Sequence, residues 1–177
     1  MTLRPLDRKE VAQLGPYYRG RWVYLRHAAR LLHELAPRTV LEVGPGPHRF
    51  VHGSDTLDLD EGFGPTFHHD AGAAPWPAKD GSYDLVLALQ CWEHFEGRQT
   101  TAFQEAVRVA GPGGHVLISF PYRWQNTNAT HRGIGVRRIR EWTCEREPVR
   151  RVLVRKPEGR ARLLLLFRGG VDDGGAR

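Results

Sequence analysis

The sequence predicts an α/β fold with a mostly parallel sheet, and three apolar runs carry this prediction. Residues 39–43 are rich in β-branched and apolar side chains and end at two glycines, which is typical of a buried parallel strand. Residues 85–89 and 116–120 are further apolar runs, and a helical pattern over residues 99–109 lies between them. At 177 residues, the chain fits one domain of this class.

Composition favours an ordinary soluble globule, with 40% hydrophobic and 26% charged residues. The first ten residues are charged and lack the apolar core of a signal peptide. The longest apolar run, residues 163–167, is too short to span a bilayer. Two cysteines are too few for a disulfide framework. We therefore expect a cytoplasmic protein with no membrane segment.

The net charge of +6 is unevenly distributed along the chain. Residues 123–168 hold thirteen Arg or Lys against four Glu, whereas residues 55–84 are acidic. A basic half can bind nucleic acid or anionic substrates. The high Arg content with few Lys favours a solvated arginine-rich surface, so specific nucleic-acid binding is not expected.

The N-terminal region is expected to be a loose arm followed by one amphipathic helix. Residues 1–15 lack periodicity. Pro16 suits a first helical turn, residues 17–35 follow a helical pattern, and Pro37 ends it. The expected buried face consists of Trp22, Leu25, Ala29 and Leu32.

The first crossover of the sheet is predicted to lack its usual helix. Pro45, Pro47 and Gly53 leave little room between the first strand and the run at residues 56–60. A parallel crossover normally needs a dozen or more residues and a helix. We expect a loop or a single turn here.

The rest of the chain completes the sheet. The pattern predicts a strand at residues 66–71, a proline-rich turn segment at 75–84, a polar loop at 122–135, a helix at 136–142, and an antiparallel hairpin of residues 149–154 and 161–167. The residues from 169 onward are expected to be disordered.

The glycines after the first strand indicate a ligand site. Gly44 and Gly46 bring backbone to the carboxyl edge of the sheet, where open α/β sheets bind ligands. The dinucleotide fingerprint requires a third glycine, but Arg49 stands at that position. Glu42 would repel a pyrophosphate, whereas it suits a cationic amine or a ribose hydroxyl. The residues therefore favour a positively charged nucleoside without phosphates.

This stretch resembles the class I S-adenosylmethionine-dependent methyltransferases, whose first strand ends in Glu/Asp-x-Gly-x-Gly-x-Gly. Glu42, Gly44 and Gly46 match the pattern, and His48 replaces its third glycine. Residues 77–86, Pro-Ala-Lys-Asp-Gly-Ser-Tyr-Asp-Leu-Val, are similar to the family's "PxxDGSFDxV" stretch, and the Glu-His pair at 93–94 is similar to its "LEH" element.

The resemblance implies a Rossmann-like, seven-stranded, mostly parallel sheet with the antiparallel hairpin at its C-terminal end. It covers residues 16–168, so we expect an N-terminal arm at 1–15, an S-adenosylmethionine-binding domain at 16–168 and a disordered tail at 169–177.

The resemblance also implies the residues of the cofactor site. Asp58 would hold the ribose hydroxyls, with Asp60 as the fallback, and Asp70 and the Ala71 N–H would meet the adenine. The complete implied set is Tyr17, Glu42, Gly44, Pro45, Gly46, Asp58, Leu59, Asp70, Ala71 and Gln90. His68 and His69 are a poor pair of metal ligands because adjacent strand residues face opposite sides, so no metal is expected.

The leading function is methyl transfer from S-adenosylmethionine to a small-molecule acceptor, with secondary metabolites among the options. His94 and His131 follow the fourth and fifth strands and are the candidate bases, His94 first. A base is needed only if the acceptor arrives protonated.

Two alternatives remain at this point. One is a nucleic-acid methyltransferase, although residues 90–93 lack an Asn/Asp-Pro-Pro-Tyr-type sequence. The other is a protein that binds the cofactor without methyl transfer, as a partner subunit or as the pocket for another reaction. The acceptor site could be open, completed by a homodimer, or served by a carrier.

Overall fold

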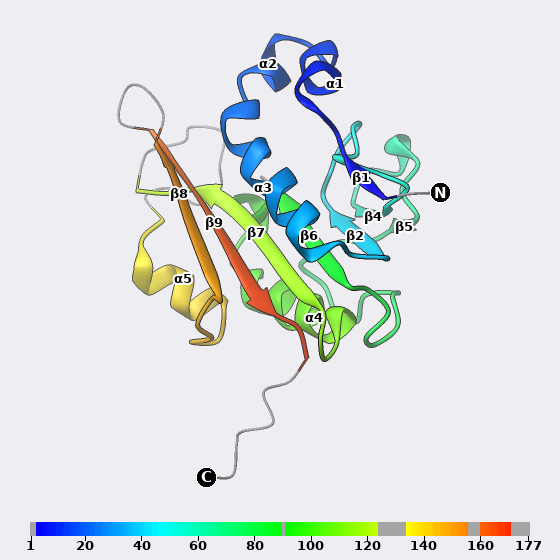
Figure 1. The fold of residues 1–177 in the computed structure, drawn as a ribbon. Coiled ribbons are helices and arrows are strands. Elements are labelled where there is room, and N and C mark those ends of the chain that lie inside the picture. The colour runs from blue at the N-terminus through cyan, green and yellow to red at the C-terminus, as the bar shows by residue number, and fades with distance from the viewer. Residues whose placement is uncertain (1–2, 90, 124–133, 156–159, 171–177) are drawn as a thin grey trace.

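The computed structural model describes residues 3–89, 91–123, 134–155 and 160–170, and it contains one seven-stranded sheet (Figure 1). The strand order is β5-β4-β2-β6-β7-β9-β8. Neighbours from β5 to β7 are parallel, and β9 pairs antiparallel with both β7 and β8. The strands are β2 Val40–Val43, β4 Asp55–Asp58, β5 Phe67–His68, β6 Leu85–Leu89, β7 His115–Pro121, β8 Arg150–Arg155 and β9 Ala161–Arg168. The predicted fold class is confirmed.

Helices cover both faces of this sheet (Figure 1). α3 packs on one face, where its buried side chains join those of alternate residues of β6, β7 and β9. α4 and α5 pack on the other face. The helices are α1 Arg8–Gln13, α2 Pro16–Arg19, α3 Trp22–Leu35, α4 Gln99–Ala110 and α5 Val136–Trp142; the single 3₁₀ turns are η1 Glu61–Phe63 and η2 Trp92–His94.

The first crossover contains no helix, as predicted. Residues 44–54, all of which the structure describes, form a loop that includes only the short strand β3, Val51–His52. β3 pairs antiparallel with β1, Arg4–Pro5, in a separate two-stranded sheet. The N-terminus of the chain therefore takes part in covering the crossover loop.

The expectation of a loose arm at residues 1–15 is wrong for its described part. β1 and α1 form there, and Val11 is buried in the core beneath α3. Asp7 caps α1 by accepting hydrogen bonds from backbone N–H groups, and Glu10 bonds back to the Asp7 N–H. This capping box explains why so short a helix forms.

The helix expected over residues 17–35 is divided into α2 and α3. Gly20 is the C-cap of α2, and Arg21 is the N-cap of α3. Tyr17 and Tyr18 therefore belong to α2 and not to the longer helix.

The C-terminal region forms the predicted hairpin and the predicted helix at 136–142. The third strand is shorter than expected, since only Phe67 and His68 of residues 66–71 pair with β4. The expected disorder from residue 169 does not begin there, because the Gly169 and Gly170 N–H groups donate to Gly114 and Val107 carbonyls. Residues 171–177 lie outside the described residues.

No helix in the described ranges is long and apolar enough to cross a membrane.

Candidate functional site

Two cavities lie at the carboxyl edge of β2 and share one residue, Gly44. The larger cavity, about 410 Å³, lies toward β4 and η2, and its lining includes Asp58 and Asp70. The smaller cavity, about 90 Å³, lies toward α2 and α3, and its lining includes Arg21. The bare backbone of Gly44 is therefore the point at which an elongated ligand could pass from one cavity to the other.

Gly44 cannot carry a side chain at this position. Its φ of +60° is in the left-handed region, and an added Cβ would lie 2.6 Å from Cβ of Cys91. Cys91 is buried and its Sγ–H donates to the Val43 carbonyl at 3.1 Å, and burial raises the pKa of its thiol. The contact between the end of β2 and Cys91, two residues after β6, therefore requires glycine at position 44.

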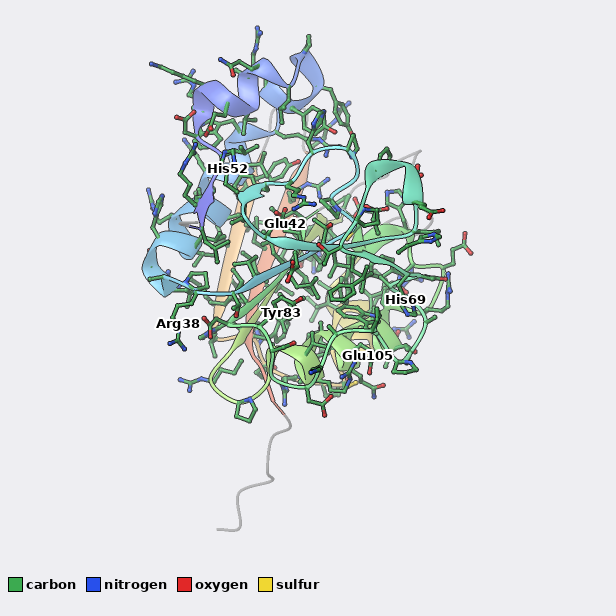
Figure 2. The ribbon with its side chains drawn as sticks, turned by 90° about the vertical axis from the view of Figure 1, so that its right-hand side faces the viewer. Arg38, Glu42, His52, His69, Tyr83 and Glu105 are labelled. Carbon is green, nitrogen blue, oxygen red and sulfur yellow. The ribbon has the colours of Figure 1, made fainter. Side chains whose placement is uncertain are left out.

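Glu42 is buried under the crossover loop. In Figure 2 it lies between the N-terminal helices and Tyr83. Its carboxylate accepts hydrogen bonds from the N–H groups of Phe50 and Val51, both at 2.8 Å, and from the Ser54 hydroxyl at 2.6 Å. Burial raises the pKa of this carboxyl, and these three hydrogen bonds oppose the rise. Glu42 thus fastens the loop that replaces the crossover helix.

Asp58 joins the glycine loop to the end of β4. Its Oδ2 accepts from the Gly46 N–H at 2.9 Å, and its Oδ1 accepts from the Asp60 N–H at 3.1 Å. Each oxygen accepts a single hydrogen bond from the described residues, although an ionised carboxylate oxygen has capacity for two. The carboxylate lines the larger cavity, so it is held in place with capacity left for a ligand.

Asp70 follows β5 and lines the same cavity. It accepts hydrogen bonds from the Arg98 guanidinium and from the Gly72 N–H, the latter at 2.8 Å. Burial would raise the pKa of the Asp70 carboxyl, but these hydrogen bonds outweigh it and hold the pKa below its usual value. Arg98 is a cavity residue that sequence reasoning missed.

The smaller cavity is bounded by Arg21, Tyr18 and His48, and the rings of Tyr18 and His48 meet edge to face at 5.0 Å between centroids. The Arg21 guanidinium lies 3.8 Å from the centre of the Tyr17 ring. Among the described residues it makes no hydrogen bond or ion pair. Tyr17 itself is 66% exposed and lines neither cavity, so Tyr18 stands where Tyr17 was expected.

The remaining sequence-predicted residues divide between these cavities. Leu59, Ala71 and His94 line the larger cavity together with Gly46, and Pro45 lines the smaller one. Gln90 and His131 lie outside the described residues.

His68 and His69 each make a hydrogen bond to a backbone carbonyl, that of Leu59 and that of Ala73 (Figure 2 labels His69). Within the described part of the chain, no three His, Cys, Asp or Glu side chains gather closely enough to hold a metal ion.

A central parallel sheet in this order, ending in an antiparallel pair and opening at a glycine loop, is the fold of the class I S-adenosylmethionine-dependent methyltransferases. Residues 55–118 match the family model described as a methyltransferase domain. The resemblance is therefore confirmed for the fold and for this segment.

Three known proteins illustrate the similarity. The norajmaline N-methyltransferase of Rauvolfia serpentina is 42% identical over 48 residues, which are 27% of this chain and 16% of that protein. The Burkholderia thailandensis 1,6-didemethyltoxoflavin-N1-methyltransferase, solved with bound 1,6-didemethyltoxoflavin and S-adenosylhomocysteine, aligns over 96% of this chain and 95% of its own, with 18% identity and a TM-score of 0.61. The [4+2]-cyclase SpnF aligns over 80% of both chains, with 14% identity and a TM-score of 0.58.

Proposed function

We propose that the chain binds S-adenosylmethionine across the two cavities and transfers its methyl group to a small-molecule acceptor. The observation that carries the proposal is the meeting of the cavities at Gly44, with the Asp58 carboxylate on one side and, on the other, the Arg21 guanidinium, which has no ion pair among the described residues. S-adenosylmethionine has this polarity, because its ribose hydroxyls donate hydrogen bonds and its methionine end carries a carboxylate.

On the nucleoside side, Asp58 would accept hydrogen bonds from the ribose hydroxyls through the capacity that its two oxygens retain. Leu59, which is 66% exposed, lines this cavity. Phe63, which is 44% exposed, lies beside Gly46 of the glycine loop. Apolar side chains of this kind would cover the faces of an adenine. Asp70, already held by Arg98, would meet its amino group.

On the methionine side, Arg21 would pair with the carboxylate. Arg21 is partly buried, and this burial lowers the pKa of its guanidinium. A buried guanidinium without an ion pair is costly, and a ligand carboxylate would relieve that cost. Glu42, whose oxygens are engaged by the loop, would act by holding the cavity wall and not by direct contact.

The bound sulfonium supplies an activated methyl group, so the protein's task is to align the acceptor and to exclude water. His94 stays our proposal for a base where the acceptor arrives protonated. It is exposed on η2 and lines the larger cavity. We propose a nitrogen acceptor, because two of the similar proteins are named as N-methyltransferases.

A second candidate function is cofactor binding without methyl transfer. The similarity to a protein titled as a cyclase and the replacement of the third glycine by His48 favour it. The same pocket would then shape another reaction.

Turnover separates the two functions. The protein is incubated with S-adenosylmethionine and pools of small nitrogen heterocycles and amines, and S-adenosylhomocysteine is measured by mass spectrometry together with any product heavier by one methylene. We expect both to appear in equal amounts for at least one pool. Tight binding of S-adenosylhomocysteine with no methylated product in any pool would favour the second function.

A further inference from the structure

A buried charged pair lies beside the candidate cofactor site, on the α3 side of the sheet. Glu93, in η2, faces Arg162, at the start of β9, with 3.7 Å between Oε1 and Nη2. The two side chains are only 2% and 11% exposed. The separation is too long for a hydrogen bond, so the two charges attract one another without satisfying their hydrogen-bonding groups.

Three polar atoms of this cluster have no hydrogen-bond partner among the described residues. They are Oε2 of Glu93, Nη1 of Arg162 and Oγ of Ser119. Leaving such groups buried and unsatisfied is costly, and more so where the group is charged. Folded proteins pair nearly all buried polar atoms, so three orphans together indicate a missing partner.

The cluster adjoins the smaller cavity. Ser119 is opposite Leu89 in the β6–β7 register, and Leu89 lines that cavity. The Arg162 guanidinium lies 4.8 Å from the centre of the Tyr24 ring. Tyr24 is three residues, about one helical turn, after Arg21 in the sequence. The charge of Arg162 lowers the pKa of Arg21, and the charge of Glu93 raises it. The orphaned atoms thus lie next to the end of the site assigned above to the methionine carboxylate.

We propose that Glu93, Arg162 and Ser119 recognise the methyl acceptor, and that they select an uncharged group that donates one hydrogen bond and accepts another at neighbouring atoms. An N–H beside a C=O, as in a lactam or an oxo-substituted nitrogen heterocycle, has this arrangement. The N–H would donate to Glu93 Oε2, the C=O would accept from Arg162 Nη1, and the Ser119 hydroxyl could serve as either.

The charges of the cluster favour an uncharged head group. Glu93 and Arg162 neutralise one another, and Arg21 is matched by the cofactor carboxylate if the proposed function holds, on which this inference rests. A charged acceptor would add an unbalanced charge to a buried site, which is strongly unfavourable. A carboxylate would also repel Glu93, and an ammonium group would repel Arg162.

The orphaned atoms are buried, so the acceptor reaches them only after a side chain moves. Arg21 lines the cavity on this side. Its movement toward the cofactor carboxylate would clear the way, and this predicts that the acceptor group binds after the cofactor.

The test is titration of three probes into protein saturated with S-adenosylhomocysteine, followed by heteronuclear NMR. The probes are 2-pyridone, with an N–H beside a C=O, benzoate and benzylamine. We expect 2-pyridone to bind and to shift the backbone signals of Glu93, Ser119 and Arg162, and to bind more weakly when the nucleoside is omitted. Calorimetry on the same sample first establishes that S-adenosylhomocysteine is bound, so that failure of the proposed function is recognised separately.

Variants locate the binding. Glu93→Gln removes the negative charge and replaces one acceptor oxygen with an NH₂ donor. This variant should weaken 2-pyridone binding about tenfold or more. Ser119→Ala removes an unpartnered hydroxyl, so it should leave stability nearly unchanged while weakening 2-pyridone. Glu105→Gln is the matched control, because Glu105 is also a buried carboxylate paired with an arginine, Arg108, but lies on α4 (Figure 2).

The expected result is weaker 2-pyridone binding in the first two variants, with S-adenosylhomocysteine affinity unchanged in all three. Preferred binding of benzoate or benzylamine at these residues would overturn the inference. So would unchanged 2-pyridone binding in Glu93→Gln and Ser119→Ala, or a crystal structure with 2-pyridone in which water molecules alone satisfy the three atoms.

Discussion

Asp58→Ala is expected to weaken S-adenosylhomocysteine binding at least about a hundredfold. The Asp58 carboxylate is held by the Gly46 and Asp60 N–H groups and keeps capacity for two further donors. A hydrogen bond to a charged group contributes about 1.5–3 kcal/mol, and two ribose hydroxyls would make two such bonds. The loss of both, about 3 kcal/mol or more, corresponds to at least a hundredfold. Calorimetric titration measures this change directly.

Asp60→Ala is the matched control for this variant. Asp60 is two residues away and caps η1 through its bond from the Gly62 N–H at 2.9 Å, but it does not line the larger cavity. We expect its effect on affinity to be less than about fivefold. Equal affinities for the two variants would show that the contact with the ribose hydroxyls is wrongly assigned to Asp58. Thermal unfolding of both variants separates a loss of ligand contact from a loss of the bond to Gly46.

His94→Ala is expected to lower turnover by about 10²–10⁴-fold for an acceptor that must lose a proton before or during methyl transfer. Removal of a positioned base has an effect of this size. Because the contacts proposed for Asp58 and Arg21 with the cofactor do not involve His94, S-adenosylhomocysteine affinity should change only a few-fold. Initial rates across a pH series, with wild type alongside, provide the measurement.

His69→Ala serves as the control histidine. Its ring lines the same cavity but is bonded to the Ala73 carbonyl. It should keep turnover near normal, and the pH dependence of the residual rate should change only in His94→Ala. Near-normal rates in both variants would mean that methyl transfer needs only alignment of the acceptor with the methyl group, and no histidine base.

The parts of the fold that the sequence predicted depend on short-range patterns. The apolar runs that became β2, β6 and β7 are bounded by turn residues, so their type and place could be read locally. The same holds for the absent crossover helix, because prolines and a glycine occupy the space that it would need. The clustering of Asp58 and Asp70 with the glycine loop followed from the rule that parallel strands bring their carboxyl ends to one edge.

Features that depend on pairing between distant segments could not be read from the sequence. Glu93 and Arg162 meet only because of the register of β9 against β7, which no local pattern specifies. The engagement of Glu42 by Phe50 and Val51 follows from the path of a loop with no regular structure. The contact that explains Gly44 likewise comes from Cys91, which follows the carboxyl end of the neighbouring strand β6.

The N-terminal error has a different cause. The Asp7–Glu10 capping box is visible in the sequence, but α1 is too short to show a helical period. Besides the capping box, α1 is stabilised by burial of Val11 and by the pairing of β1 with β3, both of which are tertiary contacts.

Calorimetric titration of the purified chain with S-adenosylhomocysteine and, separately, with NAD tests the account most directly. Asp58, Arg21 and the Gly44 backbone favour a nucleoside with a carboxylate and no phosphates, and Arg49 replaces the glycine that a pyrophosphate would need. We expect one molecule of S-adenosylhomocysteine to bind per chain and NAD to give no heat of binding. Binding of NAD without binding of S-adenosylhomocysteine would contradict it.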